Sequence, residues 1–265
     1  MRRSPALLLT VASLTLSACS PTASSGTADG PADGPPWGLH VDYQLGGAHD
    51  PADGVTGVVR DRTASPAPGL WSACYVNAFQ TQPGIDEVPE DLLLHDAAGA
   101  RVEDPDWPGE FLLDISTDGQ RARVADLVGG WFDGCAADGF DAVEPDNLDS
   151  WTRSHGQLTA DDAAALASLL VERAHDAGLE IAQKNTADLD GAAIGFDYAV
   201  TEQCQVYDEC DAYTAAYGNR VVEVEYTDEA FEEACAARGD EVAVQRRDRD
   251  VSVPGTEGYV SRFCS

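Results

Sequence analysis

Residues 139–149 read GFDAVEPDNLD, and they place four carboxylates, Asp141, Glu144, Asp146 and Asp149, around one short apolar run. The run has the composition of a buried strand, in which acids at the tip serve no packing purpose. A (β/α) barrel presents its catalytic groups in this way, from the carboxyl ends of its strands. The alternative is a solvated acidic loop in an acidic protein, but seven other strand-like runs also end in polar residues. The stretch therefore predicts an active site at the carboxyl-end face of a barrel.

The rest of the chain continues the same pattern of strands and helices. Eight apolar, β-branched or aromatic runs lie at residues 40–45, 56–60, 71–77, 140–144, 179–183, 196–201, 221–226 and 242–245. Amphipathic helical patterns separate several of them, at 120–137 and at 159–177. Thr159 with Asp162 predicts a capped helix start, and Gly178 predicts the helix end. Strands that alternate with helices indicate a parallel sheet.

The first two units lack a helical pattern. Residues 46–55 and 61–70 are rich in Gly, Pro and Ala, so these connections are expected to be loops. The fold prediction is an α/β (β/α)8 TIM-type barrel with poorly helical first two units. A doubly wound open sheet remains the alternative, although no Gly-rich phosphate loop follows the first strand.

The amino terminus has the pattern of an export signal. Arg2 and Arg3 precede an apolar stretch at 6–16, which is too short to span a bilayer. The sequence Leu-Ser-Ala-Cys at 16–19 resembles a bacterial lipobox, in which Cys19 becomes the lipid anchor; an ordinary secretory signal is the alternative. We expect a lipoprotein signal peptide at 1–19, a flexible linker at 20–36 and a barrel domain at 37–265. The predicted location is extracytoplasmic, either anchored to the cell membrane by lipid or secreted.

Six further cysteines remain, an even number that in an exported protein predicts three disulfides. Neighbouring barrel elements favour the pairs Cys74 with Cys135, Cys204 with Cys210, and Cys235 with Cys264, although the sequence alone leaves other pairings open. The cysteines lack the paired C-x-x-C spacing of a structural zinc site, so no metal is expected. The formal charge of −31 excludes nucleic-acid binding through phosphates. It fits a cationic partner, and equally an acidic surface that only maintains solubility.

Polar side chains stand at the carboxyl end of nearly every run, which indicates a site for a polar, hydroxyl-rich ligand. Lys184 is the only lysine among the 16 basic residues, and this favours a short-range role beside a carboxylate. The sequence contains no G-x-S-x-G elbow and no H-E-x-x-H zinc motif. Two carboxylates on opposite sides of a glycosidic bond hydrolyse it without a cofactor. Aromatic side chains for a sugar to stack on are also available, at Tyr43, Tyr75, Trp151 and Tyr226.

These residues resemble one known family. The motifs are YQLG at 43–46, CY at 74–75, GFDAVEPDN at 139–147, QKN at 183–185, TEQC at 201–204 and EVEY at 223–226. In this order and spacing they are similar to glycoside hydrolase family 114, over essentially the whole of residues 37–264. The resemblance implies a (β/α)8-type barrel, endo-α-1,4-polygalactosaminidase activity on a polysaccharide that is cationic, and no cofactor. A non-catalytic glycan-binding surface lipoprotein is the alternative function.

The family's two catalytic acids follow the fourth and sixth strands. The resemblance therefore implies Asp146 as nucleophile and Glu202 as acid/base of a retaining hydrolase, with Glu144 as the rival nucleophile. Strand alternation puts residues 144 and 146 on one side unless Pro145 interrupts the pleat. Lys184 is expected to keep Asp146 ionised. The residues expected to contact substrate are Tyr43, Gln44, Tyr75, Asn147, Asp149, Lys184, Asn185, Glu225 and Tyr226.

Overall fold

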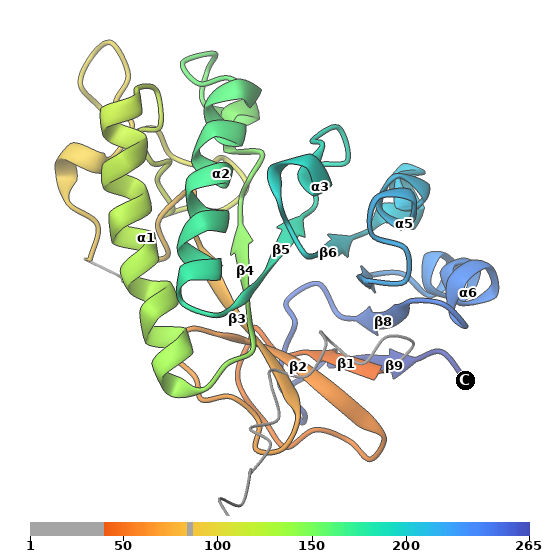
Figure 1. Ribbon diagram of the computed structural model, residues 1–265. Helices are drawn as coiled ribbons and strands as arrows, with labels where there is room; N and C mark the ends of the chain where they lie inside the picture. The colour runs from red at the N-terminus through yellow and green to blue at the C-terminus, as the bar shows by residue number, and fades with distance from the viewer. Residues whose placement is uncertain (1–39, 84–86) are drawn as a thin grey trace, which may run out of the picture. The chain divides into compact units, whose positions relative to one another are not determined.

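Eight parallel strands form the centre of the fold, one at each of the eight apolar runs (Figure 1). They are β1 (His40–Tyr43), β2 (Val55–Asp61), β3 (Trp71–Asn77), β4 (Ala142–Asp146), β5 (Glu180–Lys184), β6 (Tyr198–Glu202), β7 (Val221–Glu225) and β8 (Ala243–Arg247). The computed structural model describes residues 40–83 and 87–265. The signal peptide, Cys19 and the linker expected at 1–36 lie outside the described residues.

The strands follow one another around a nearly closed barrel. Their order in the sheet is the order in the sequence, whereas a doubly wound sheet reverses direction midway, so the open-sheet alternative is wrong. The backbone N–H of Tyr43 in β1 donates to Oε1 of Gln245 in β8 at 2.8 Å, which brings the first and eighth strands together. A ninth strand that the sequence did not predict, β9 (Ser261–Phe263), pairs antiparallel with β8. The barrel prediction is confirmed.

Alternate residues of the strands fill the barrel interior. All eight parallel strands contribute to one buried cluster, through Val41, Tyr43, Val59, Trp71, Ala73, Ala142, Ala182, Tyr198, Val200, Val222, Val224 and Ala243. The residues between them, such as Val143 and Ile181, belong to a second cluster that also contains Phe132 and Leu166 of the surrounding helices. Successive side chains of a strand point to opposite sides, so every second residue faces the barrel interior, and we say that these residues have the interior parity. The last residue of that set in each strand points toward the barrel mouth.

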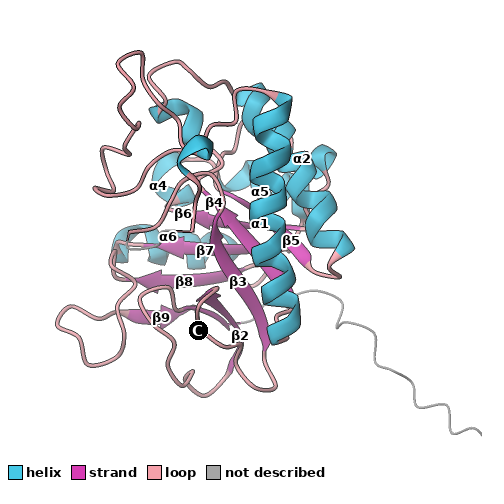
Figure 2. Ribbon diagram, turned by 90° about the vertical axis from the view of Figure 1, so that its left-hand side faces the viewer, coloured by secondary structure: helices cyan, strands magenta, loops and turns pink. Residues whose placement is uncertain are grey.

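Helices cover the outside of the later strands, and loops join the first three, as predicted (Figure 2). The helices are α1 (Asp118–Asp138), α2 (Ala160–Asp176), α3 (Gly191–Ile194), α4 (Cys204–Tyr207), α5 (Cys210–Tyr217) and α6 (Asp228–Arg238). Thr159 and Asp162 form a reciprocal capping box that begins α2, which satisfies backbone donors with no partner inside the helix. None of the helices within residues 40–83 and 87–265 is long and apolar enough to cross a membrane.

The connection between β3 and α1 is long and forms one wall of the barrel mouth. It contains the 3-10 helix η1 (Glu90–Leu92) and isolated antiparallel bridges such as Gln80 with Leu112. Leu112 and Leu113 are fully buried and anchor this connection to the larger cluster. A second 3-10 helix, η2 (Ser150–Arg153), follows β4. These segments carry polar residues whose positions the strand pattern alone does not determine.

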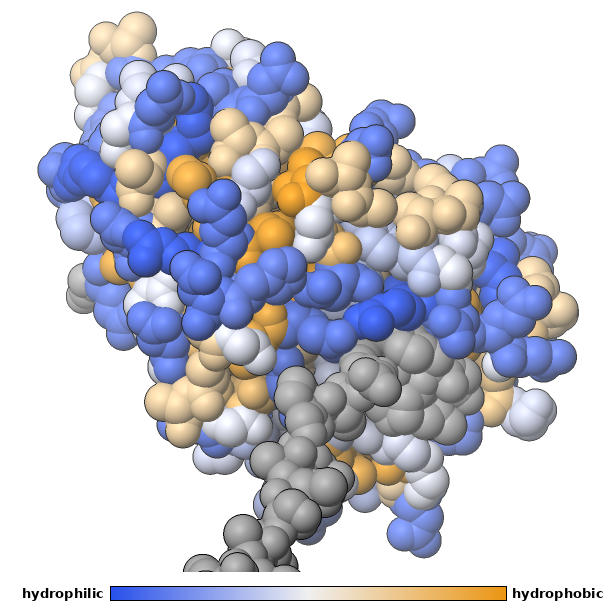
Figure 3. All heavy atoms as spheres, in the orientation of Figure 1, coloured by the Kyte–Doolittle hydropathy of each residue, from blue (hydrophilic) through white to orange (hydrophobic). Residues whose placement is uncertain are grey.

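Three disulfides tie the later elements to the barrel. They join Cys74 to Cys135, Cys204 to Cys210 and Cys235 to Cys264, which are the pairs favoured by the proximity of barrel elements. Cys204 and Cys210 lie on α4 and α5, directly after the sixth strand. Hydrophilic residues cover most of the face seen in Figure 3, in keeping with the charge of −31.

Candidate active site

A cavity of about 800 Å³ opens at the carboxyl ends of the strands. Its floor includes the last residues of three neighbouring strands, Asp146 of β4, Lys184 of β5 and Glu202 of β6. Tyr75 and Tyr226 also line it. Each of these five residues has the parity of the barrel interior, so the strand pleat itself directs them into one space.

Lys184 connects the acids of the site. Its Nζ lies 2.9 Å from Oε1 of Glu144, 3.3 Å from Oδ1 of Asp146 and 3.1 Å from Oε2 of Glu202. Burial disfavours its charged form, but the surrounding carboxylates outweigh burial and raise the pKa of Lys184 well above its usual value. The ammonium is therefore charged at neutral pH, and it is the cation shared by the three acids.

Asp146 is held as a carboxylate. Tyr75 donates its hydroxyl to Oδ2 at 2.7 Å, and the backbone N–H of Asn147 donates to Oδ1 at 2.7 Å. Burial opposes ionisation, but Lys184 and these donors keep the pKa of Asp146 below its ordinary value. An ionised carboxylate that remains 18% exposed to the cavity has the charge and the access required of a nucleophile.

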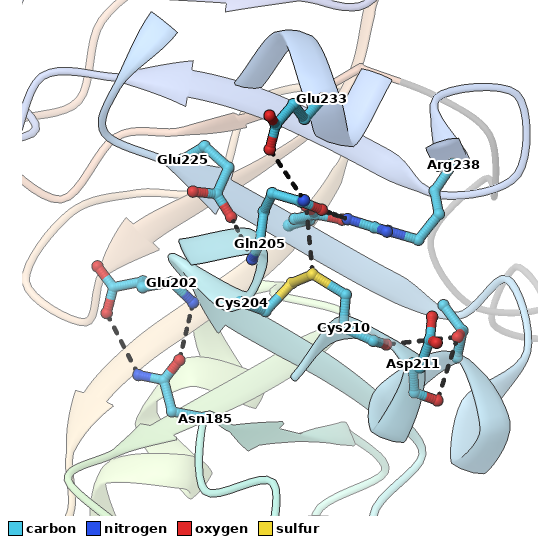
Figure 4. Close-up of a disulfide and its surroundings, with 11 residues drawn as sticks. Asn185, Glu202, Cys204, Gln205, Cys210, Asp211, Glu225, Glu233 and Arg238 are labelled. Carbon is cyan, nitrogen blue, oxygen red and sulfur yellow. Dashed lines mark hydrogen bonds and ion pairs between the residues drawn. A yellow bond between two sulfur atoms is a disulfide. The ribbon is translucent and has the colours of Figure 1, made fainter. Parts of the chain in front are cut away.

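Glu202 faces Asp146 across the shared ammonium. Tyr226 donates its hydroxyl to Oε1 of Glu202, and Asn185 contacts Oε2 through its amide at 3.5 Å. The backbone N–H of Glu202 in turn donates to Oδ1 of Asn185 at 2.8 Å, so the two residues fix each other (Figure 4). The Glu202 side chain is 26% exposed, more than that of Asp146, and so is accessible to a leaving group or water.

Glu144 lies beneath the cavity and does not line it. It is fully buried, and its Oε1 accepts from Tyr43 at 2.6 Å and contacts Lys184. Burial raises the pKa of Glu144. Pro145 leaves the pleat intact, because Glu144 and Asp146 both contact Lys184. Glu144 and Tyr43 therefore support the floor of the site from below.

The residue directly after each of the strands β4, β5 and β6 has a backbone conformation in the left-handed region. Asn147 has φ 67°, Asn185 has φ 49° and Gln203 has φ 60°. Asn adopts this conformation at lower cost than most residues, and such strain is found where function requires a side chain to stay in place. The turn lets Asn147 donate its backbone N–H to Asp146 and lets Asn185 bond to Glu202.

Three of the residues expected to contact substrate do not line the cavity, and the first of them is Tyr43, which lies beneath it and bonds to Glu144. Gln44 is buried and bonds to Asp42 and Arg60, and Glu225 is buried with its Oε1 accepting the backbone N–H of Gln205. The side chains of Gln44 and Glu225 point to the opposite side of their strands from those of Tyr43 and Tyr226. They therefore lie behind the wall of the cavity and do not contact it. Asn147, Asp149 and Asn185 do line the cavity.

Other lining residues were not predicted. Arg153 of η2 pairs with Asp104 at 2.7 Å and with Asp149 at 2.9 Å, and Glu110 and Trp107 come from the long connection after β3. Trp107 is 56% exposed, which is unusual for so large an apolar side chain. The only signal for Trp107 and Glu110 in the sequence was a polar segment too long for a simple crossover.

Glu225 makes folding stability depend on pH. Burial raises its pKa to about 7, and its Oε2 has no hydrogen-bond partner among the described residues. Between the unfolded pKa of about 4.3 and this value, the folded protein holds a proton that the unfolded chain has released, so stability falls as pH rises through that window. Replacing Glu225 by Gln removes the charge.

We expect Glu225→Gln to melt at a higher temperature than the parent at pH 8, and this gain in Tm should exceed the gain at pH 5 by about 2–4 °C. The difference corresponds to about 1 kcal/mol after solvent screening. Thermal unfolding of both proteins at the two pH values measures this. Glu172→Gln, on the exposed face of α2, is the matched control and should melt like the parent at each pH. An equal Tm change at both pH values would contradict the assignment.

Comparison with known proteins agrees with this fold. The family model described as glycoside-hydrolase family GH114 matches residues 21–265. The crystal structure of Aspergillus fumigatus Ega3 in complex with galactosamine has a TM-score of 0.67 at 24% identity, over 89% of this chain and 97% of that one. The glycoside hydrolase domain of PelA from Pseudomonas aeruginosa has a TM-score of 0.52 at 16% identity, over 82% and 97%. No curated protein matches the chain. The two structures share the barrel fold.

Proposed function

Because the chain belongs to glycoside hydrolase family GH114, we propose that it is an exported enzyme that cleaves α-1,4-linked galactosamine-containing polysaccharide by a retaining, two-carboxylate mechanism. The observation that carries the proposal is the pair Asp146 and Glu202, both in contact with Lys184 in one open cavity. Ega3, which has the same fold, was crystallised with galactosamine.

In the proposed reaction, Asp146 attacks the anomeric carbon while Glu202 protonates the leaving glycosidic oxygen. Glu202 then takes a proton from water, which hydrolyses the glycosyl-enzyme ester and frees Asp146. Two oxygens that both lie within 3.3 Å of one nitrogen are necessarily close to each other. This fits the separation of about 5–5.5 Å in retaining enzymes better than the about 6.5–9.5 Å of inverting ones.

The charge of the cavity supports a cationic polymer. Ten carboxylates line it, against the three basic side chains Arg153, Lys184 and Arg249. A cleft lined by one sign of charge concentrates ligands of the opposite sign. Polygalactosamine carries an ammonium on each sugar and matches this field. We therefore expect cleavage of the polymer to slow as salt is raised.

The three disulfides support an oxidising compartment outside the cytoplasm. We propose that Cys19 carries a lipid anchor, that residues 20–36 form the tether and that residues 37–265 form the catalytic domain. Cys19→Ala should move the protein from the membrane fraction to the soluble fraction or block its processing. A mature amino terminus beginning at Ser20 or later in the unaltered protein would contradict the anchor.

A panel of purified polymers tests the activity. The enzyme should generate new reducing ends from α-1,4-linked galactosamine polymer and not from neutral α-1,4-linked galactose polymer. A time course of product length distinguishes internal cleavage from trimming of chain ends. Binding of the polymer without new reducing ends would instead support a glycan-binding role.

A further inference from the structure

The carboxylates that line the cavity differ in whether a cation neutralises them. Asp146 and Glu202 share Lys184, and Asp104 and Asp149 share Arg153. Glu110 lines the same cavity and forms no ion pair with any described residue. Two neutral amides hold it instead, Asn77 at 2.9 Å and Gln80 at 2.7 Å, and both donate to Oε2.

This arrangement leaves Oε1 of Glu110 without a hydrogen-bond donor among the residues described. Oε2 is fixed from two directions, so the side chain cannot rotate freely to find another partner. Arg153, a guanidinium that lines the same cavity, contacts Gln80 and Asn147 and already pairs with Asp104 and Asp149. A half-buried carboxylate in this position is prepared to accept a charged donor from a ligand.

Glu110 is also placed beside the nucleophile. Asn77, its anchor, is the last residue of β3 and lies opposite Asp146 of β4 in the parallel register. The same Asn77 accepts from the side-chain amide of Asn147 at 2.8 Å, and the backbone N–H of Asn147 bonds to Asp146. A short hydrogen-bonded chain therefore links Glu110 to Asp146 and sets the distance between them.

We infer that Glu110 is the specificity-determining residue that accepts a hydrogen bond from the 2-ammonium group of the sugar attacked by Asp146. The inference rests on the proposed function and adds to it the residue that recognises the amine of this sugar. The amino group lies on the carbon next to the anomeric centre, so a carboxylate next to the nucleophile is where it can be recognised. An N-acetyl group is neutral and larger, and it cannot form this ion pair.

The electrostatics agree with this role. Burial raises the pKa of Glu110, and the neighbouring Asp146 and Asp104 contribute in the same direction. A bound ammonium would stabilise the carboxylate and lower that pKa. No cation among the described residues pairs with Glu110, so an uncharged substrate would leave this carboxylate unpaired. The site therefore favours a charged substrate over an uncharged one.

The test compares kcat/KM for fully deacetylated and fully N-acetylated α-1,4-linked oligomers of equal length. Glu110→Gln keeps the shape of the side chain and removes its charge. We expect it to lower kcat/KM for the deacetylated oligomer by about 10- to 100-fold, and to change the value for the N-acetylated oligomer by less than about threefold. Glu110→Asp keeps the charge on a shorter side chain and should retain part of the preference. Glu172→Gln, far from the cavity, should leave both values unchanged.

An equal loss on both oligomers would overturn the inference, since it would show that Glu110 only positions Asp146. An unchanged preference would overturn it as well. A binding measurement separates failure of this inference from failure of the proposed function. Calorimetric titration with galactosamine and with galactose should show a preference for the amine that Glu110→Gln removes, even if neither oligomer is cleaved. A wild-type protein that prefers the amine but cleaves nothing would contradict the hydrolase proposal and leave the role of Glu110 standing.

Discussion

Replacing Asp146 by Asn is expected to reduce polymer cleavage below detection while leaving the fold and polymer binding intact. Asn has the same size, but its amide cannot form the glycosyl ester. Glu202→Gln removes only proton transfer, for which a loss of about 10²–10⁴-fold is expected. Rates of reducing-end release measure both. Asp133→Asn and Glu172→Gln, on the exposed faces of α1 and α2, are the matched controls and should retain full activity.

Azide distinguishes the two roles by the stereochemistry of its product. With Glu202→Ala and an aryl α-galactosaminide that has a good leaving group, the glycosyl-enzyme still forms, and azide attacks it without needing a base. The product should be the α-glycosyl azide, with the configuration of the substrate retained. With Asp146→Ala, azide occupies the place of the nucleophile and should give the β-glycosyl azide. NMR of the products reads the anomeric configuration directly.

The same experiments decide between Asp146 and Glu144. Glu144 is fully buried and does not line the cavity, so Glu144→Gln should weaken catalysis only through Lys184. Full activity in Asp146→Asn, together with loss of activity in Glu144→Gln, would transfer the nucleophile to Glu144. Full activity in Glu202→Gln would contradict the two-carboxylate mechanism in this form.

The sequence was sufficient to predict the strands because each buried run has a turn or a polar residue on either side. The eight runs coincide with the eight parallel strands to within a few residues. The N-cap of α2 was also predictable, since Thr159 and Asp162 act within one turn. β9 could not be predicted, because a three-residue edge strand has no periodicity of its own and depends on β8 for its hydrogen bonds.

The floor of the site was predictable to the extent that strand parity determines it. Tyr75, Asp146, Lys184 and Glu202 all continue the interior positions of their strands. Gln44 and Glu225 also stand at strand ends, but their side chains point to the other side of the strand, so the period of two excludes them from the cavity. Glu110 and Arg153 could not be predicted, because they lie on irregular connections whose positions depend on tertiary contacts.

Lys184→Met is expected to cause the largest loss of stability among single substitutions in the site. It leaves the carboxylates of Glu144, Asp146 and Glu202 without the ammonium that all three contact. Removing one partner from a buried ion pair costs about 3–5 kcal/mol. The loss should be greater at pH 8 than at pH 5, because the unpaired acids can take up protons at the lower pH. Denaturant unfolding at both pH values measures it.

The same substitution should also move the pH profile of the enzyme. Lys184 is the main cation that keeps the pKa of Asp146 low, and without it that pKa should rise. The acid limb of kcat/KM reports ionisation of the nucleophile in the free enzyme, so it should shift to higher pH. A merely structural lysine would lower stability and leave this limb in place.

A double variant separates the electrostatic cause from lost packing. Lys184→Met with Glu144→Gln removes one of the uncompensated charges, and it should recover part of the stability lost in Lys184→Met alone. Glu144→Gln by itself should have a smaller effect, since Lys184 then still pairs with Asp146 and Glu202. Additive effects of the two substitutions would contradict direct coupling, because residues in one ion-pair network couple strongly. The shared ammonium would then support packing alone, and the low pKa of Asp146 would need another source.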